Sequence, residues 1–95
     1  MYYSVVECTA DTLIRTEMGI VHGIHICFDG VTAGDKVEIR DAVAAAAGTV
    51  RFTFVADATD QSYAFTPHAG MKFSTGIFVD VIKTGGSMYV TVVYE

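Results

Sequence analysis

Two histidines and a cysteine fall close together in the segment IVHGIHICF (20–28), where they could act as metal ligands. Imidazole and thiolate are the ligands that zinc prefers, but a structural zinc site needs a closed set of four. Side chains alternate between the faces of a strand, so His22 should lie on one face and His25 with Cys27 on the other. His68, in the TPHAG loop, is the only further imidazole. We therefore expect a central strand covered on both faces, without a metal.

Other chemically capable residues also lack the patterns that catalysis or ion binding requires. Asp57 and Asp60 in the DATD loop miss the spacing of a calcium-binding EF-hand, which favours a solvated turn. Asp35 and Glu38 have no evident desolvated partner for acid–base work. The sequence contains no nucleophile elbow and no glycine-rich phosphate loop. We expect no catalytic residue, no cofactor and no enzymatic activity.

Aromatic residues offer a third possibility, a sugar-binding face. The candidates are Tyr2, Tyr3, Tyr63, Phe65 and Phe73. Sugar-binding platforms often use tryptophan, of which the chain has none. Packing in the core, or anchoring of a protein interface where tyrosine is enriched, is the competing interpretation.

The charge and composition limit the partners of the chain. Its net charge is −5 and its six Lys and Arg residues are scattered, which argues against nucleic acid and against an anionic membrane surface. The start of the sequence has no signal-peptide pattern, so we expect synthesis in the cytoplasm and reduced thiols at Cys8 and Cys27. Only 18% of residues are charged while 52% are hydrophobic, which suggests apolar surface that a partner covers.

Short alternating segments separated by turn residues predict the fold. The expected strands are 2–7, 12–16, 20–28, 36–41, 50–56, 62–66, 76–82 and 88–94. A spacing of about 8–12 residues per strand and turn is typical of an antiparallel sandwich. We expect residues 1–95 to form a single all-β domain, a sandwich of about eight strands and of jelly-roll or immunoglobulin-like size. The alanine-rich segment 41–48 should form one short helical turn or a loop.

Alternation within the strands predicts which side chains face the core. Val50 should point inward together with Phe52 and Phe54, and Asp80 should point outward between two buried valines. The KTGGS segment has the glycines of a tight turn and predicts a β-hairpin between the last two strands. Segments 2–7 and 88–94 are expected to offer free edges that could extend a neighbour's sheet.

Some apolar residues have no clear place inside such a sandwich, and these are the candidate interface residues. They are Tyr2, Tyr3, Val5, Phe78 and Tyr89.

The order of these segments resembles a known group of proteins. The opening MYYSVVECTADTLIRTEMGIVHGIHI, the middle GDKVEIRDA…AGTVRFTFVA and the closing GMKFSTGIFVDV…GGSMYVTVVYE are similar to the small β-sandwich virion proteins of tailed bacteriophages. The resemblance extends over nearly the whole chain as a succession of strand patterns.

This resemblance implies a structural role in the virion. The chain would be a capsid decoration (cement) subunit on the outer head surface, with the major capsid protein and further copies of itself, in a dimer or trimer, as partners. A tail, head-fibre or neck accessory subunit is the alternative within the same group, and a carbohydrate-binding module is the alternative from another class. The family supplies no catalytic residues.

Overall fold

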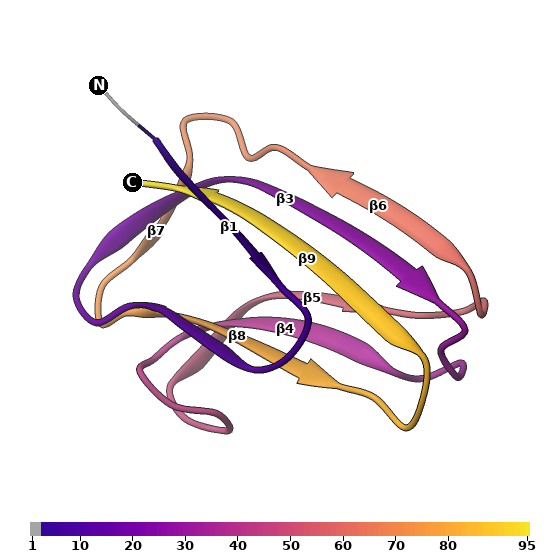
Figure 1. Ribbon diagram of the computed structural model, residues 1–95. Helices are drawn as coiled ribbons and strands as arrows, with labels where there is room; N and C mark the ends of the chain where they lie inside the picture. The colour runs from indigo at the N-terminus through magenta and orange to yellow at the C-terminus, as the bar shows by residue number, and fades with distance from the viewer. Residues whose placement is uncertain (1–2) are drawn as a thin grey trace.

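The computed structural model describes residues 3–95, which fold into two facing antiparallel sheets (Figure 1). The strands are β1 (Ser4–Cys8), β2 (Thr12–Arg15), β3 (Gly19–Asp29), β4 (Lys36–Asp41), β5 (Thr49–Val55), β6 (Gln61–Phe65), β7 (Met71–Phe73), β8 (Ile77–Ile82) and β9 (Ser87–Tyr94). Sheet A has the order β1-β9-β3-β6, with β7 also on β3, and sheet B has the order β2-β8-β4-β5. The predicted all-β antiparallel sandwich is confirmed, with nine strands rather than about eight.

The additional strand, β7, belongs to an interrupted edge strand. Both β6 and β7 pair antiparallel with β3, the first along Ile24–Phe28 and the second along Gly19–Val21, with the 66–70 loop between them. If β6 and β7 count as one strand, the two sheets have the strand orders 1-8-3-6 and 2-7-4-5. This order is that of a jelly roll, the double Greek key in which successive strands mostly alternate between sheets.

The last two strands do not form the predicted hairpin. Strand β8 lies in sheet B between β2 and β4, whereas β9 lies in sheet A between β1 and β3. The 83–86 turn therefore crosses from one sheet to the other (Figure 1). Strand β9 is paired on both sides and offers no free edge, while β1 remains at the edge of sheet A.

The core fills the space between the sheets with β-branched and aromatic side chains. Its largest fully buried members are Phe28, Phe73, Ile26, Ile39, Ile77, Met88, Val21, Val31, Val37, Val79, Val90 and Val92. Most of them come from the strands of the two sheets, and along β3 and β9 they alternate with more exposed neighbours, as pleated strands require. No helix in the part of the chain that is described, residues 3–95, is long and apolar enough to cross a membrane.

Two β-bulges shift the predicted alternation. In β3, Val21 pairs with Tyr94 and Gly23 with Val93, so His22 is an extra residue. Val21 is therefore in the core on the same side as Ile24, and the prediction that His22 shared the face of Ile24 was wrong. A strand pattern with period two cannot show where an extra residue interrupts it.

The second of these bulges lies in β5. Ile39 pairs with Phe52 and Arg40 with Val50, which leaves Arg51 as the extra residue. Phe52 packs against the core, as expected, but Val50 lies beside Arg40 on the outer face of sheet B and is partly exposed. The prediction that Val50 points inward was therefore wrong.

The outer face of sheet B carries a network of charges. Arg40 Nε donates to Asp80 Oδ2 at 3.0 Å and Arg40 Nη2 donates to Glu38 Oε1 at 2.8 Å. Lys36 Nζ lies 3.5 Å from the other oxygen of Glu38. Asp80 is outward-facing as predicted, but only 6% of it is exposed, because Arg40 and the 42–48 loop cover it.

Segment 41–48 is a loop and contains no helical turn. Ala46 adopts a left-handed φ of 57° and its N–H points to Asp80 Oδ2 at 3.4 Å, while Ala47 accepts a hydrogen bond from Arg40 Nη1 at 3.2 Å. A left-handed residue interrupts a right-handed helix. The loop is thereby held against the charged face of sheet B.

Two aspartates fasten the loops at opposite ends of the sandwich. Asp41, at the end of β4, accepts backbone hydrogen bonds from Ser74, Thr75 and Gly76 and one from the Ser74 hydroxyl. Asp35 accepts hydrogen bonds from the backbone of Thr32 and from Thr84. Burial by itself would raise the pKa of each carboxyl, but these hydrogen bonds outweigh it and hold both pKa values below the ordinary 3.8.

Candidate docking face

The centre of the outer face of sheet A carries less charge than the outer face of sheet B. Alternation with the core residues places the following side chains there: Tyr3, Val5, Glu7, His22, Gly23, His25, Cys27, Ser62, Ala64, Tyr89, Thr91 and Val93. Glu7 is the one carboxylate among them and none is Lys or Arg, while Asp29 and Lys72 lie on the same outer face at its margins. Depletion of charge together with tyrosine is the compositional mark of an interface core. We call this surface the docking face.

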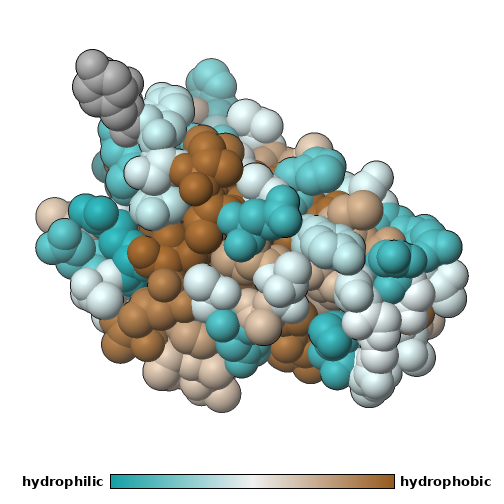
Figure 2. All heavy atoms as spheres, viewed as in Figure 1, coloured by the Kyte–Doolittle hydropathy of each residue, from teal (hydrophilic) through white to brown (hydrophobic). Residues whose placement is uncertain are grey.

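Apolar side chains on the docking face are well exposed to solvent. Val5 is 65% exposed and Tyr89 39%. Figure 2 shows hydrophobic atoms gathered beside the N-terminal part of the molecule, while the opposite end of the same view is mostly hydrophilic. A strand that borders solvent normally alternates apolar with polar residues, so exposed aliphatic and aromatic groups here suit contact with a protein better than contact with water.

Gly23 gives the docking face a recess. A cavity of about 200 Å³ lies over β3 and its neighbours, with walls from His25, Ala64, Thr91 and Val93. Small side chains at these positions leave the face low at its centre, between the more prominent Val5 and Tyr89. A protruding side chain of a partner could enter this recess.

His22 organises one corner of the docking face. Its ring stacks on Tyr3 at a centroid distance of 4.3 Å, and its Nε2 lies 3.2 Å from Glu95 Oε1. The bulge at His22 therefore ties the beginning of the described chain to its last residue. Backbone hydrogen bonds in both directions between Ile20 and Glu95 strengthen this tie.

The opening cluster does not form a metal site in the described residues. The bulge brings His22 to the same face as His25 and Cys27, but among residues 3–95 no group of three or more His, Cys, Asp or Glu side chains could hold a metal ion. His25 is exposed, so the expectation that this strand is covered on both faces was wrong within the single chain. Cys8 and Cys27 are free thiols, and burial raises the pKa of Cys8.

The structure places the predicted interface residues in three different situations. Tyr3, Val5 and Tyr89 are exposed and belong to the docking face. Phe78 points to the outer face of sheet B as predicted, between Leu13 and Arg40, but only 8% of it is exposed, so it offers little surface to a partner. Tyr2 lies outside the described residues.

Three of the sugar-binding candidates, Phe73, Tyr63 and Phe65, take part in packing between the sheets. Phe73 is buried in the core. Tyr63 stacks on Phe54 at 4.5 Å and Phe65 stacks on Phe52 at 5.2 Å, which joins the edge strands β6 and β5 across the two sheets. A ring that is stacked on a neighbour has one face already covered, so the 37% of Tyr63 that is exposed belongs to the other face and the rim of its ring. These aromatic residues close an edge of the core.

The sequence could identify individual members of the docking face but not the face as a whole. Its side chains come from strands that are neighbours in the sheet but lie far apart along the chain. Examples are Cys27 of β3, Ala64 of β6, and Thr91 and Val93 of β9. The charge-poor strand β9 was the available signal, but its neighbours were unknown without the topology. No match to this chain was found among protein-family models, curated proteins or solved structures.

Proposed function

We propose that this chain is a non-enzymatic structural subunit of a tailed-phage virion, a capsid decoration (cement) protein. It binds the major capsid protein on the outer surface of the head, and it associates with further copies of itself as a dimer or trimer. The docking face provides the contact with the shell. The sequence resemblance to small phage virion proteins supports the choice of partner, and jelly rolls are common among viral capsid proteins, although a fold alone does not define function.

The contrast between the two outer faces is the observation that carries the proposal. On sheet B, Glu38, Arg40 and Asp80 satisfy one another within the chain. On sheet A, Val5 and Tyr89 project beside small uncharged residues, without a charge network. The outer face of sheet B also exposes Leu13, Val55 and Ile82, so the two faces differ in charge and not in exposed apolar side chains. A cement subunit needs a broad surface rather than a deep pocket, because it must hold many identical sites on a shell. An interface of standard size buries about 800 Å² per partner.

The amount of this chain in purified virions tests the proposal. Quantitative mass spectrometry of separated heads and tails should find it in heads, at a copy number comparable to that of the major capsid protein. A few or tens of copies confined to tails would support the tail alternative and overturn the cement role. Absence from both fractions would overturn a virion role altogether.

A matched pair of variants tests the docking face. Tyr89→Lys places a charge on this face, whereas Ile82→Lys places one on the outer face of sheet B, and each wild-type side chain is 39% exposed. We expect Tyr89→Lys to lower the occupancy of heads at least about tenfold, which corresponds to about 1.4 kcal/mol, and Ile82→Lys to leave it unchanged. Equal occupancy for the two variants would show that sheet A is not the contact.

A further inference from the structure

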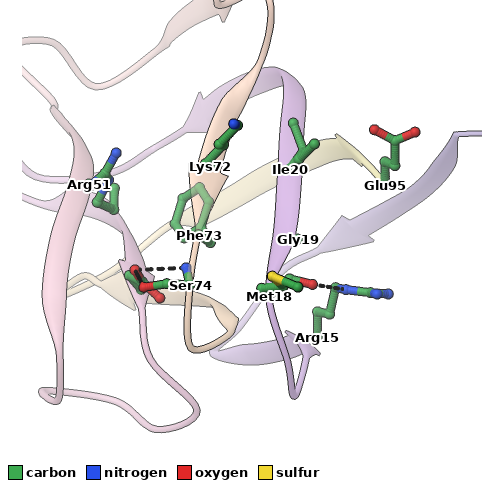
Figure 3. A pocket seen from close by; sticks show the side chains of 10 residues that line it. Arg15, Met18, Gly19, Ile20, Arg51, Lys72, Phe73, Ser74 and Glu95 are labelled. Atoms are coloured by element: carbon green, nitrogen blue, oxygen red, sulfur yellow. Dashed lines mark hydrogen bonds between the residues drawn. The ribbon is translucent and has the colours of Figure 1, made fainter.

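A hollow of about 650 Å³ lies near Glu95, away from the centre of the docking face, and its walls come from both sheets. Figure 3 shows Lys72 and Phe73 on one strand, Ile20 on the next, and Arg51 and Arg15 on opposite sides. Its volume falls in the range of about 300–1,000 Å³ that is usual for small-molecule sites. The hollow is therefore large enough for a ligand.

The charge of the hollow is opposite to that of the molecule. Arg15, Arg51 and Lys72 line it, three of the six Lys and Arg residues in a chain of net charge −5. Two carboxylates, Asp41 and Glu95, also line it. The carboxylate of Asp41 accepts hydrogen bonds from the N–H groups of residues 74–76, and the carboxylate of Glu95 contacts the His22 ring. Cations thus outnumber the carboxylates, and both carboxylates already have partners.

A β-bulge directs Arg15 into the hollow. Leu13 pairs with Phe78 and Arg15 with Ile77, so Ile14 is an extra residue in β2. Ile77 is fully buried, and Arg15 consequently lies on the inner side of its strand. A Cβ at Gly19 would stand 2.7 Å from Arg15 Cδ, so the Arg15 side chain packs closely over this glycine.

The bulge in β5 acts on Arg51 in a similar way. Regular alternation would have placed Arg51 on the outer face of sheet B, opposite Phe52. The bulge instead gives the outer position to Val50, and Arg51 lines the hollow. Bulges at sheet edges often redirect a side chain toward a site, and two separate bulges direct two arginines here.

The three cationic side chains that line the hollow differ in whether they already have partners within the chain. Arg15 Nε donates to Met18 O at 2.6 Å and its Nη2 lies 3.3 Å from Glu17 Oε1. Within residues 3–95, Arg51 and Lys72 form no ion pair, and both are exposed. Ile20 and the exposed Met18 give the hollow an apolar component. An exposed guanidinium and an ammonium beside apolar walls suit an anionic head on an apolar body.

We propose that this hollow binds a small organic anion, a carboxylate or phosphate carried on a short apolar body. Arg51 and Lys72 contact the anionic group, Arg15 adds positive charge to the wall of the hollow, and Ile20 with Met18 contacts the apolar part. This inference is independent of the proposed virion role, because the site is formed by other side chains than those that define the docking face.

Calorimetric titration of the full chain with hexanoate, hexyl phosphate and 1-hexanol tests the proposal. The three probes share an apolar body and differ in the charge of the head. Hexanoate or hexyl phosphate should bind at least about tenfold more tightly than hexanol. Equal affinities for the three probes, or no saturable binding of either anion up to about 10 mM, would overturn it.

The double variant Arg51→Ala, Lys72→Ala identifies the site of binding. It should weaken binding of the anion about tenfold and leave hexanol binding unchanged, since both side chains are exposed and make no internal ion pair. Lys83→Ala removes an exposed lysine of the β8–β9 turn and is the control, with unchanged affinity expected. If the double variant binds the anion as tightly as the wild type, the hollow is not the binding site.

Discussion

Asp41 shows how one side chain can fix a loop that its own strand does not reach. Its carboxylate receives three backbone N–H groups and a hydroxyl from residues 74–76, at distances between 2.7 and 3.3 Å. The RDAV sequence around Asp41 carries no sign of this role, because its partners are about thirty residues away. Such contacts depend on the topology, which local sequence patterns do not contain.

The lowered pKa of Asp41 has a consequence for stability at acid pH. Because its pKa is lower in the folded chain than in the unfolded one, its contribution is complete above 3.8 and is lost as the pH falls through the folded-state pKa. Asp41→Asn should lower the Tm at pH 7 by about 4–8 °C, since an amide cannot accept all four hydrogen bonds. The difference from wild type should shrink as the pH falls below 3.8.

Thermal scans of Asp41→Asn and Asp57→Asn across this pH range provide the measurement. Asp57 lies in an exposed turn and its carboxylate makes no hydrogen bond in the described residues. Asp57→Asn should therefore follow the wild type at every pH. A pH-independent loss of Tm in Asp41→Asn would show that the charge of Asp41 is not what holds the 74–76 loop.

At the scale of single elements, the 42–48 loop depends on Gly48. This residue has a left-handed φ of 63°, and a Cβ there would collide with the carbonyl oxygen of Asp41. Gly48→Ala should cost about 1–3 kcal/mol of unfolding free energy, because the backbone must leave this conformation. Gly85→Ala, where a Cβ has open space, should change stability by no more than about 0.5 kcal/mol. Chemical denaturation of both variants measures the contrast, and equal losses would contradict this account.

The strand β4 also carries the charged network of sheet B. Arg40 joins Glu38 and Asp80, two carboxylates that are largely shielded from solvent. Arg40→Met would leave them without their shared cation, at a cost of about 3–5 kcal/mol. Arg51→Met, in the neighbouring strand, removes an exposed arginine outside the network and should have little effect. Urea denaturation measures both, and a small effect of Arg40→Met would mean that water reaches the carboxylates.

The sequence predicted most of the strands, but it predicted only in part which face of its sheet each side chain lies on. Alternation gave most of the strands and the burial of Phe52, Val79 and Val90, because hydrophobic periodicity follows directly from the pleat. It failed at His22 and Arg51, where one extra residue reverses the phase. The missed strand β7 has only three residues and lies within an interrupted edge, so it is too short to show a period.

At the scale of the whole molecule, pairing was the information that the sequence lacked. Gly85 and Gly86 correctly predicted a tight turn between the last two strands. The prediction that these strands pair with each other was wrong, because the turn joins a strand of one sheet to a strand of the other. In a jelly roll, most strands pair with strands that are distant in sequence. The low exposure of Phe78 could not be predicted for the same reason, since only the sheet order reveals its neighbours Leu13 and Arg40.

This topology predicts how the protein folds. The hairpin β4–β5 is the only pairing between consecutive strands in the described chain, so every other pairing must first close a long loop. We expect refolding in milliseconds to seconds, as for other sheets dominated by non-local contacts. The local hairpin should be present in the transition state, whereas β9, which joins β1 to β3, should dock later.

Two equivalent core truncations distinguish these stages. Val37 in β4 and Val92 in β9 are both fully buried, so each Val→Ala change should cost about 1–3 kcal/mol. In stopped-flow measurements, Val37→Ala should mainly slow folding, because its contacts form early, and Val92→Ala should mainly accelerate unfolding. The reverse assignment would place the nucleus in sheet A. The chain would then pair its most distant strands before its closest ones, and loop closure could not be the step that orders its assembly.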